Sequence, residues 1–419
     1  LNDDSIWVGQ TYDTANTTNY AISAKIWNQG IPGAGQTVCV NDSGLDSDMC
    51  YFRYDGSAGS KTEAQSPMPP DIGTLTPANK VVAYYVAPGA DAYDTPSASY
   101  HGTHVAGSVA GDNYATLSSG TTHGHNPGDG MAPQAQIVFQ DVGDSGGSLA
   151  GLAGDLSDMF QQAYDAGARI HSDSWGNESS AYDAHSMDMD EFMFRNQDFL
   201  FVVAMGNSGT APGDGSIGAP ATAKSIVSVG GTTNGGASSQ ADNLMSYSRG
   251  PVDDGRLKPD IVSPGSSIYS ASGTTSNTDN NCSAKSMSGT SMATPTTSGY
   301  LALLRQYFTD GFYPSGAANP GDALTPSGAL MKAALLVGGM SLGGTDNTSF
   351  SAVSTIPSMD QGWGRTHLDN SLYFTGDGRQ LRVWDVRHDS GISTGESVEY
   401  TVEVAASSQP LNVRLAWSD

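Results

Sequence analysis

Short, mostly apolar runs rich in β-branched residues recur along the chain with long intervals between them, and this pattern restricts the fold more than any other feature. The runs lie at residues 36–40, 81–86, 136–139, 199–204 and 225–229. Residues at helical spacing separate the third run from the fourth, namely Leu156, Met159, Phe160 and Ala163. Strands alternating with helices predict an α/β domain, a parallel sheet with helices on both faces. We expect this domain to occupy residues 1–375.

Three residues that together can activate a serine occur in the order Asp, His, Ser. Asp42 follows the strand predicted at residues 36–40, at the strand end where sites of parallel sheets gather. His101 opens a helical stretch rich in small residues, and Ser291 stands at the start of another predicted helix. A serine hydroxyl is a weak nucleophile, so a histidine must take its proton while a carboxylate orients the histidine. The order and the contexts predict a nucleophilic triad.

Asn207 is the candidate donor for the oxyanion that such a reaction forms. It follows the strand predicted at residues 199–204, within the sequence Gly206-Asn207-Ser208-Gly209. A side-chain amide at this place and the backbone N–H of Ser291 would form a two-donor oxyanion hole.

With these motifs the chain resembles the subtilisin-like serine proteases, the subtilase family. The resemblance runs from about Gly35 to about Leu368 and includes Gly255-Arg256-Leu257-Lys258-Pro259-Asp260, Gly130-Met131-Ala132-Pro133 and the segment around Ser291. Within the family, Ser174-Trp175-Gly176 and Gln361-Gly362-Trp363-Gly364 are similar to secreted alkaline proteases of the oxidatively stable type. The resemblance implies a subtilisin-like fold and a secreted serine endopeptidase with an acyl-enzyme intermediate.

The resemblance also implies where a peptide substrate binds. Gly147, Ser174, Trp175 and Gly176 would flank an extended peptide and pair with its backbone. Small residues at Ala204, Gly206 and Gly218 indicate an S1 pocket that accepts a large apolar P1 side chain. No acidic residue marks the pocket floor, so we expect broad specificity rather than a strict preference for Lys or Arg.

Two other functions compete with this one. The first is a metalloenzyme, because His101, His104, His123 and His125 lie within 25 residues. That segment has no Glu to act as a general base and no His-Glu-x-x-His, which weakens this alternative. The second is a catalytically inactive subtilase-like protein that serves as a protein-binding module.

The pattern changes after about Thr375. Alternating apolar and polar residues at 380–386, 397–404 and 411–417 predict the opening strands of a C-terminal β-sandwich domain, residues 376–419. Three strands leave unpaired edges, so we expect the rest of this domain to be missing from the 419 residues.

The excess of acidic residues and the start of the chain indicate which partners and which location to expect. The chain has 43 acidic and 18 basic residues, a net charge of −25, which disfavours nucleic acid and anionic membranes as partners. No run approaches the roughly 18 apolar residues of a membrane span. The chain begins at Leu1 without a signal peptide, so we expect a secreted, processed monomer whose partners are protein substrates and, during maturation, a pro-segment.

Two further expectations concern a disulfide bond and structural calcium. A Cys50–Cys282 disulfide is expected in an oxidising compartment, whereas Cys39 lies within the first strand and is expected to be a small core residue. The family uses structural calcium, and the densest group of hard oxygen ligands is Asp183, Asp188 and Asp190. The alternative for these aspartates is the acidic start of a helix.

Overall fold

The centre of the molecule is a parallel sheet that carries the predicted site residues at its carboxyl edge. The computed structural model describes residues 25–53, 71–112, 129–152, 154–209, 215–234, 243–276, 279, 281–346, 351–404 and 410–418. Within these ranges the sheet has seven strands in the order β2-β3-β1-β4-β5-β6-β7. Their bounds are β1 Thr37–Asp42, β2 Val81–Val86, β3 Gln136–Asp141, β4 Ile170–Asp173, β5 Leu200–Ala204, β6 Val227–Thr232 and β7 Ile261–Pro264.

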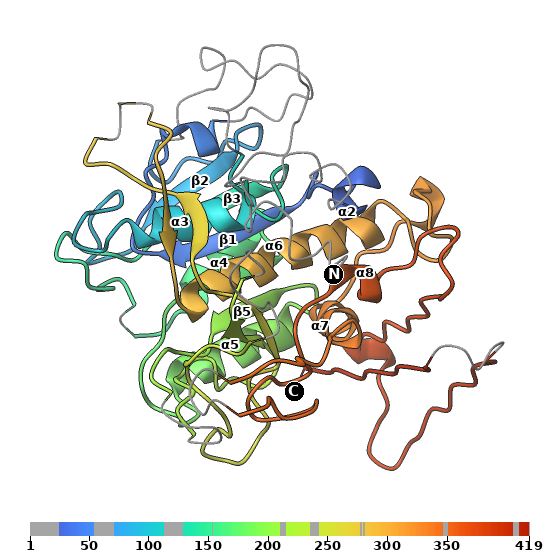
Figure 1. Ribbon diagram of the computed structural model, residues 1–419. Helices are drawn as coiled ribbons and strands as arrows, with labels where there is room; N and C mark the ends of the chain where they lie inside the picture. The colour runs from blue at the N-terminus through green and yellow to red at the C-terminus, as the bar shows by residue number, and fades with distance from the viewer. Residues whose placement is uncertain are drawn as a thin grey trace.

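Helices cover both faces of this sheet, as the sequence pattern predicts (Figure 1). The main helices are α3 His101–Ala110, α4 Ser157–Asp165, α5 Ala184–Arg195, α6 Thr290–Thr309 and α7 Gly328–Val337. Smaller elements are α2 Lys25–Asn28, α8 Leu368–Ser371, the 3-10 turns Cys50–Phe52, Pro320–Asp322 and His388–Ser390, and an antiparallel pair, β8 Ile268–Ala271 with β9 Ala284–Met287.

Strand β4 shows how side-chain alternation assigns the two faces. The hydroxyl of Ser172 accepts a hydrogen bond from Ser298 of α6, at 2.9 Å. The neighbouring His171 points to the other face, where its ring packs edge-on against Phe160 of α4, 5.5 Å between centroids. Successive strand residues point to opposite sides, so α6 and α4 must lie on opposite faces.

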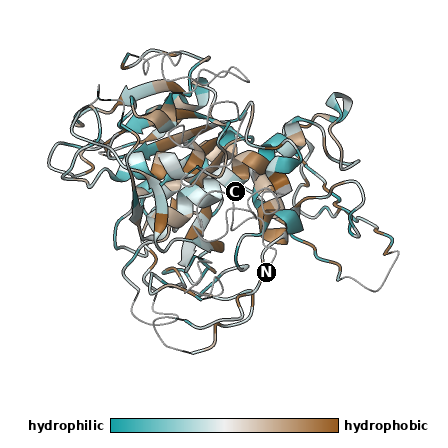
Figure 2. Cartoon of the chain, turned by 45° about the horizontal axis from the view of Figure 1, so that its top comes forward, coloured by the Kyte–Doolittle hydropathy of each residue, from teal (hydrophilic) through white to brown (hydrophobic). Residues whose placement is uncertain are grey.

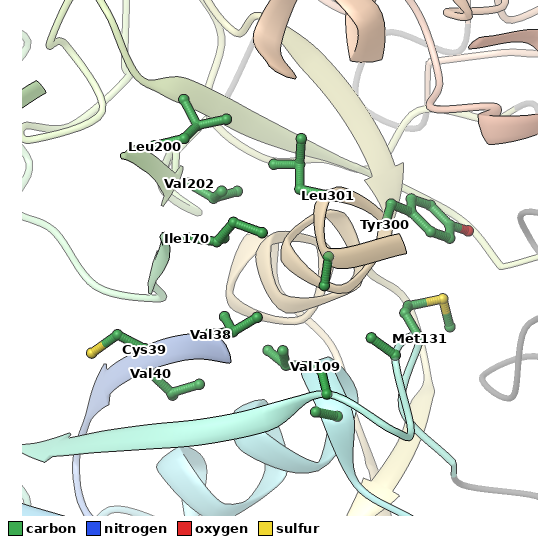
Figure 3. Close-up of a cluster of buried hydrophobic side chains, with 14 of the residues drawn as sticks. Val38, Cys39, Val40, Val109, Met131, Ile170, Leu200, Val202, Tyr300 and Leu301 are labelled. Atoms are coloured by element: carbon green, nitrogen blue, oxygen red, sulfur yellow. The ribbon is translucent and has the colours of Figure 1, made fainter. Parts of the chain in front are cut away.

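The main core lies between the sheet and α6. Figure 3 shows Val38, Ile170, Leu200 and Val202 on the strands turned toward Leu301 of α6, and all five are buried. The contiguous core extends along the chain as far as Phe374. In Figure 2 hydrophobic residues concentrate in the central strands and helices. Burying this apolar area is the dominant favourable term in folding.

The sequence pattern missed two strands of the sheet. Strand β4 contains His171 and Asp173, and β7 is only four residues long, from Ile261 to Pro264. Neither has the continuous apolar run that identifies a buried strand. Both strands are defined by their hydrogen-bonded neighbours, because β4 lies between β1 and β5, and β7 pairs with β6.

The predicted strands at 380–386, 397–404 and 411–417 are not confirmed. Among the described residues beyond Thr375 the structure assigns no strand, and their alternating apolar side chains are exposed, for example Val413 at 68% and Leu415 at 79%. An alternating segment forms a sheet only when a partner strand and a covering layer are present. Within the described ranges, these segments have neither.

None of the described helices combines sufficient length with sufficient apolar character to cross a bilayer.

Candidate active site

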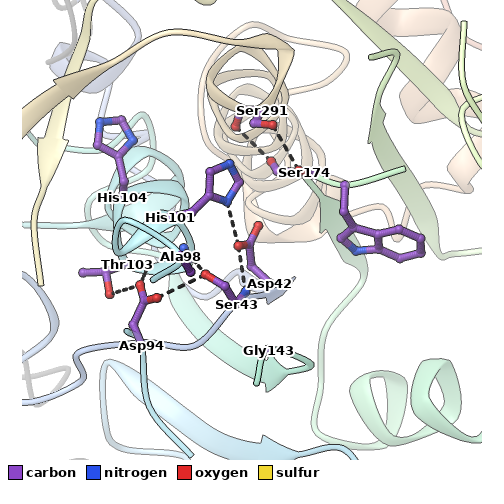
Figure 4. A network of polar contacts seen from close by, with 12 residues as sticks. Asp42, Ser43, Asp94, Ala98, His101, Thr103, His104, Gly143, Ser174 and Ser291 are labelled. Atoms are coloured by element: carbon purple, nitrogen blue, oxygen red, sulfur yellow. Dashed lines mark hydrogen bonds and ion pairs between the residues drawn. The ribbon is translucent and has the colours of Figure 1, made fainter. Parts of the chain in front are cut away.

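Asp42 and His101 come from different elements and meet at the carboxyl edge of the sheet. Asp42 is the last residue of β1 and His101 the first of α3, and Nδ1 of His101 lies 2.7 Å from Oδ1 of Asp42 (Figure 4). Burial lowers the pKa of His101, but the Asp42 carboxylate raises it by more, so the net pKa lies above its ordinary value. With Nδ1 held by the carboxylate, Nε2 is the nitrogen left to act as a base.

Asp94 supports both segments that carry this pair. Its carboxylate accepts hydrogen bonds from the hydroxyl of Ser43 (3.1 Å) and from the N–H and hydroxyl of Thr103 (2.8 and 2.7 Å). The Ser43 hydroxyl in turn accepts from the N–H of Gly102, at 3.0 Å. Burial raises the pKa of Asp94 to about 6, although these hydrogen bonds oppose the rise. Sequence reasoning missed Asp94, because a single Asp in a turn-rich segment carries no pattern.

Ser291 stands in the first turn of α6, as expected. Its hydroxyl donates to the carbonyl oxygen of Ser174 at 3.0 Å, and the Ser174 hydroxyl donates to the carbonyl of Ser291 at 2.9 Å. Figure 4 shows the His101 ring between Asp42 and Ser291. The structure therefore brings the three residues together from three distant parts of the chain.

Asn207 follows β5 and is oriented by the start of α6. Its Oδ1 accepts hydrogen bonds from the N–H and the hydroxyl of Thr290, at 2.9 and 3.1 Å. The Nδ2 group is thereby left to donate elsewhere. A Cβ atom on Gly289 would lie 3.7 Å from Nδ2 of Asn207 and 3.6 Å from the backbone N of Ser291. Both donors of the predicted oxyanion hole thus border the same space.

Three segments converge beside Asn207. The N–H of Asn177 donates to the carbonyl of Ala219 at 2.8 Å, and the N–H of Gly218 donates to the carbonyl of Met205 at 3.0 Å. These bonds bring together six of the predicted substrate-binding residues, Ser174, Trp175, Gly176, Ala204, Gly206 and Gly218. Gly218 has no room for a side chain, because a Cβ atom there would lie 1.7 Å from the carbonyl oxygen of Asn177.

Gly147, the seventh predicted substrate-binding residue, lies against a different segment. It has a φ of +86°, and a Cβ atom there would lie 2.9 Å from the backbone of Ser97. Ser97 belongs to the loop that leads into His101. Gly147 is therefore placed by the histidine side of the site rather than by the Asn207 side.

His101 and His104 do not support the metalloenzyme alternative. Nε2 of His104 faces the carbonyl oxygen of Ile268 at 3.0 Å, and burial lowers the pKa of His104 to about 3, so this histidine is a neutral donor. His123 and His125 lie outside the described residues. The described parts of the chain contain no group of three or more His, Cys, Asp or Glu side chains arranged to hold a metal ion.

The three aspartates expected to bind calcium have separate protein partners. Asp183 caps α5 by accepting from the N–H of Ser186 at 2.9 Å, which is the role of the helix-start alternative. Asp190 accepts from the N–H groups of Lys224 and Ser225, at 2.9 and 2.8 Å. Asp188 accepts a longer bond from Leu156. Calcium binding by these residues remains a prediction.

The cysteine predictions are confirmed. Cys50 and Cys282 form a disulfide with a Cα–Cα distance of 5.3 Å, and Cys39 is a buried free thiol. The bridge joins the segment after β1 to the segment before β9.

Most of the chain is similar in sequence to known proteins. Residues 33–364 match the model of the Subtilase family. The chain is 27% identical to the serine protease/ABC transporter B family protein tagD of Dictyostelium discoideum, covering 92% of this chain but 26% of that protein. It is 30% identical to the serine protease AprX of Bacillus subtilis, covering 71% of this chain and 63% of AprX.

A solved structure gives independent evidence on the fold. The prenylagaramide maturation protease PagA aligns with a TM-score of 0.51 and 21% identity, over 83% of this chain and 96% of that chain. The present chain spans about a quarter of the length of the Dictyostelium relatives tagD, tagB and tagA. Because the family model covers most of the chain and the parallel sheet agrees with it, the chain belongs to the subtilase family.

Proposed function

We propose that the protein is a serine endopeptidase in which Ser291 is the nucleophile, His101 the general base and Asp42 the residue that orients it. The observation that carries this proposal is the 2.7 Å contact between Asp42 and His101, with the ring directed toward Ser291 at the start of α6. Helix N-termini favour developing negative charge, which suits a nucleophile placed there.

The chemistry follows from these positions. Oγ of Ser291 attacks the peptide carbonyl while Nε2 of His101 takes the hydroxyl proton, and the new C–O bond gives a tetrahedral oxyanion. The N–H of Ser291 and Nδ2 of Asn207 donate to that oxyanion. His101 then gives the proton to the leaving amine as the C–N bond breaks. Water next attacks the acyl-enzyme while His101 takes its proton, and His101 returns that proton to Oγ of Ser291 as the ester C–O bond breaks and the acid leaves.

We propose that the segments beside Asn207 select the substrate. An extended peptide would pair with the backbone around Ser174–Gly176 on one side and Gly147 on the other. The small side chains of Ala204, Gly206 and Gly218 favour a large apolar P1 side chain. The physiological setting proposed with this is a secreted monomer acting on protein substrates after removal of a pro-segment.

Structural calcium is part of the same proposal. The net charge of −25 favours binding of cations, and carboxylate oxygens are the ligands that calcium prefers. Chelation is expected to lower the melting temperature of the protein, and re-addition of calcium should restore it. An unchanged melting temperature would remove calcium from the proposal.

A serine-directed fluorophosphonate provides the direct test. Wild type should carry one label, on the peptide that contains Ser291, and Ser291→Ala should lose both label and peptide hydrolysis. Ser286→Ala is the matched control, because Ser286 is an exposed serine on the neighbouring strand β9. Folded wild-type protein that takes no label would favour the inactive protein-binding module.

A further inference from the structure

A row of buried polar side chains crosses the α4 face of the sheet, and the proposed reaction does not use it. The row consists of Cys39 and Asn41 on β1, Gln140 on β3, and His171 and Asp173 on β4. The strand register places these residues side by side, since Asn41 pairs with both Gln140 and Asp173. All five are 2% exposed or less, in a layer that is otherwise rich in phenylalanine.

The hydrogen bonds of His171 determine its charge. Nδ1 lies 2.9 Å from Oδ2 of Asp173, and Nε2 lies 3.1 Å from Oε1 of Gln140. The amide of Gln140 is oriented by its own nitrogen, which donates to the carbonyl oxygen of Met159 at 2.7 Å. Both ring nitrogens of His171 therefore face acceptors, so both carry protons and the ring is an imidazolium. Burial lowers the pKa of His171, but Asp173 and Cys39 together outweigh burial and raise the pKa to about 10.

From Gln140 the chain of hydrogen bonds continues to Trp175. Oε1 of Gln140 also accepts from Nδ2 of Asn41, at 3.4 Å. The opposite atom of that amide, Oδ1 of Asn41, accepts from the indole Nε1–H of Trp175 at 3.0 Å. Oε1 of Gln140 thus links the charged His171 to Nδ2 of Asn41, and Oδ1 of the same Asn41 amide holds the indole N–H.

Trp175 lies next to the reacting residues. It follows Ser174, whose carbonyl and hydroxyl are both hydrogen-bonded to Ser291. The indole is 9% exposed, so most of its surface is packed against protein. Its edge N–H donates to Oδ1 of Asn41, so a shift of Asn41 changes how the packed ring is held.

We propose that His171 is a positioning residue for substrate selection, which acts through Gln140 and Asn41 on Trp175 and thereby on the segment Ser174–Gly176 that is proposed to bind the peptide. This inference rests on the proposed function. Fold stability alone does not require the row, because a buried ion pair can often be replaced by apolar residues without loss of stability. An apolar replacement of His171 would fill the space but would remove the charged donor to Oε1 of Gln140, the atom that also accepts from Asn41.

The test compares two peptide substrates that differ only by Phe or Ala at P1, using kcat/KM for wild type, His171→Leu, Trp175→Phe and the double variant. His171→Leu should lower the Phe/Ala ratio about 10-fold, mainly through KM for the Phe peptide. Trp175→Phe removes the same hydrogen bond at its other end. The double variant should therefore change the ratio little beyond either single variant.

Phe160→Leu is the matched control, because Phe160 contacts the His171 ring but makes no hydrogen bond in the row. It should leave the Phe/Ala ratio at the wild-type value. A general loss of packing would lower kcat/KM for both peptides equally. An unchanged ratio in His171→Leu, or strictly additive effects in the double variant, would overturn the inference.

A second variant covers the case in which His171→Leu fails to fold. Gln140→Met keeps the His171–Asp173 pair and the side-chain volume but removes the link to Asn41, and it should lower the ratio by a similar factor. The fluorophosphonate label on Ser291 separates the two proposals. Wild type without label or hydrolysis contradicts the proposed function, whereas labelled, active variants with wild-type selectivity contradict only the role of His171.

Discussion

Oδ1 of Asn207 accepts two hydrogen bonds from Thr290, one from its backbone N–H and one from its hydroxyl. Thr290 directly precedes the proposed nucleophile, so the same residue orients the oxyanion donor and begins the nucleophile helix. A change in the side chain of Asn207 should therefore lower turnover, because it removes the proposed oxyanion donor and the acceptor for Thr290.

Asn207→Leu should reduce kcat by about 10²–10³, the loss found when one such donor is removed from a subtilisin, with KM changed little. Steady-state kinetics on a P1-Phe peptide measures this. Thr290→Ser keeps both donors to Asn207 and should retain nearly full activity. A wild-type kcat in Asn207→Leu would mean that the oxyanion is stabilised by other groups.

Asp42→Asn should reduce kcat by about 10⁴, because the amide favours the wrong tautomer of His101. The pH profile gives a further check. Asp42 raises the pKa of His101, and the reaction needs the unprotonated base, so activity rises as pH rises through that pKa. In the residual activity of Asp42→Asn the acidic limb of kcat/KM should move to lower pH. An unmoved limb would assign that ionisation to another group.

Asp46→Asn should stabilise the fold at alkaline pH. Burial and the neighbouring Asp48 raise the pKa of Asp46 from 3.8 to about 8, so the folded state holds a proton that the unfolded state releases. Wild-type stability therefore falls as pH rises from about 4 to about 8. The variant lacks this loss and should be more stable at pH ~9 by at least about 1 kcal/mol, since one pKa unit corresponds to about 1.4 kcal/mol.

Denaturant unfolding at pH ~5 and ~9, in the Ser291→Ala background to prevent self-digestion, measures the effect of Asp46→Asn. Asp279→Asn is the control, because the pKa of Asp279 is shifted in the opposite direction to that of Asp46. Its hydrogen bond from Thr274 lowers the pKa of Asp279, so removal of that charge should not stabilise the protein. Equal stability of Asp46→Asn and its parent at both pH values would contradict the assignment.

Asp385→Ala should detach the segment beyond Thr375 from the catalytic domain. The carboxylate of Asp385 accepts from the N–H of Ser327 at 2.8 Å and from its hydroxyl at 2.5 Å, while that hydroxyl caps α7 by accepting from the N–H of Leu330. The Ser327 cap stays in the variant, so the loss is that of hydrogen bonds to a charged acceptor, about 1.5–3 kcal/mol.

Limited proteolysis of Asp385→Ala, again in the Ser291→Ala background, should show faster cleavage within residues 376–404. Asp389→Ala removes an exposed carboxylate from the same segment and should behave like its parent. Equal cleavage rates for the two variants would show that Ser327 does not hold this segment in place.

Much of the site could be predicted because its residues stand where the chain pattern changes. Asp42 ends an apolar run, His101 and Ser291 open helical segments, and Asn207 follows the strongest strand signal. Such positions can be recognised locally, since strand ends and helix starts have their own composition. The strands predicted beyond Thr375 are not confirmed, because alternation shows what a segment can form but not whether partner strands are present.

The sequence by itself determined the alternation of strands and helices, the order of the three reacting residue types and the family to which they belong. Only the tertiary structure decided what surrounds them. Asp94, His171 and Gln140 carry no local signal. Asp94 bonds to Ser43 and His171 to Gln140 across long stretches of chain, so these contacts arise from the tertiary fold, including the strand order β3-β1-β4, and from burial. A buried polar group must find a partner wherever the fold supplies one, and that choice depends on three-dimensional packing rather than on neighbours in sequence.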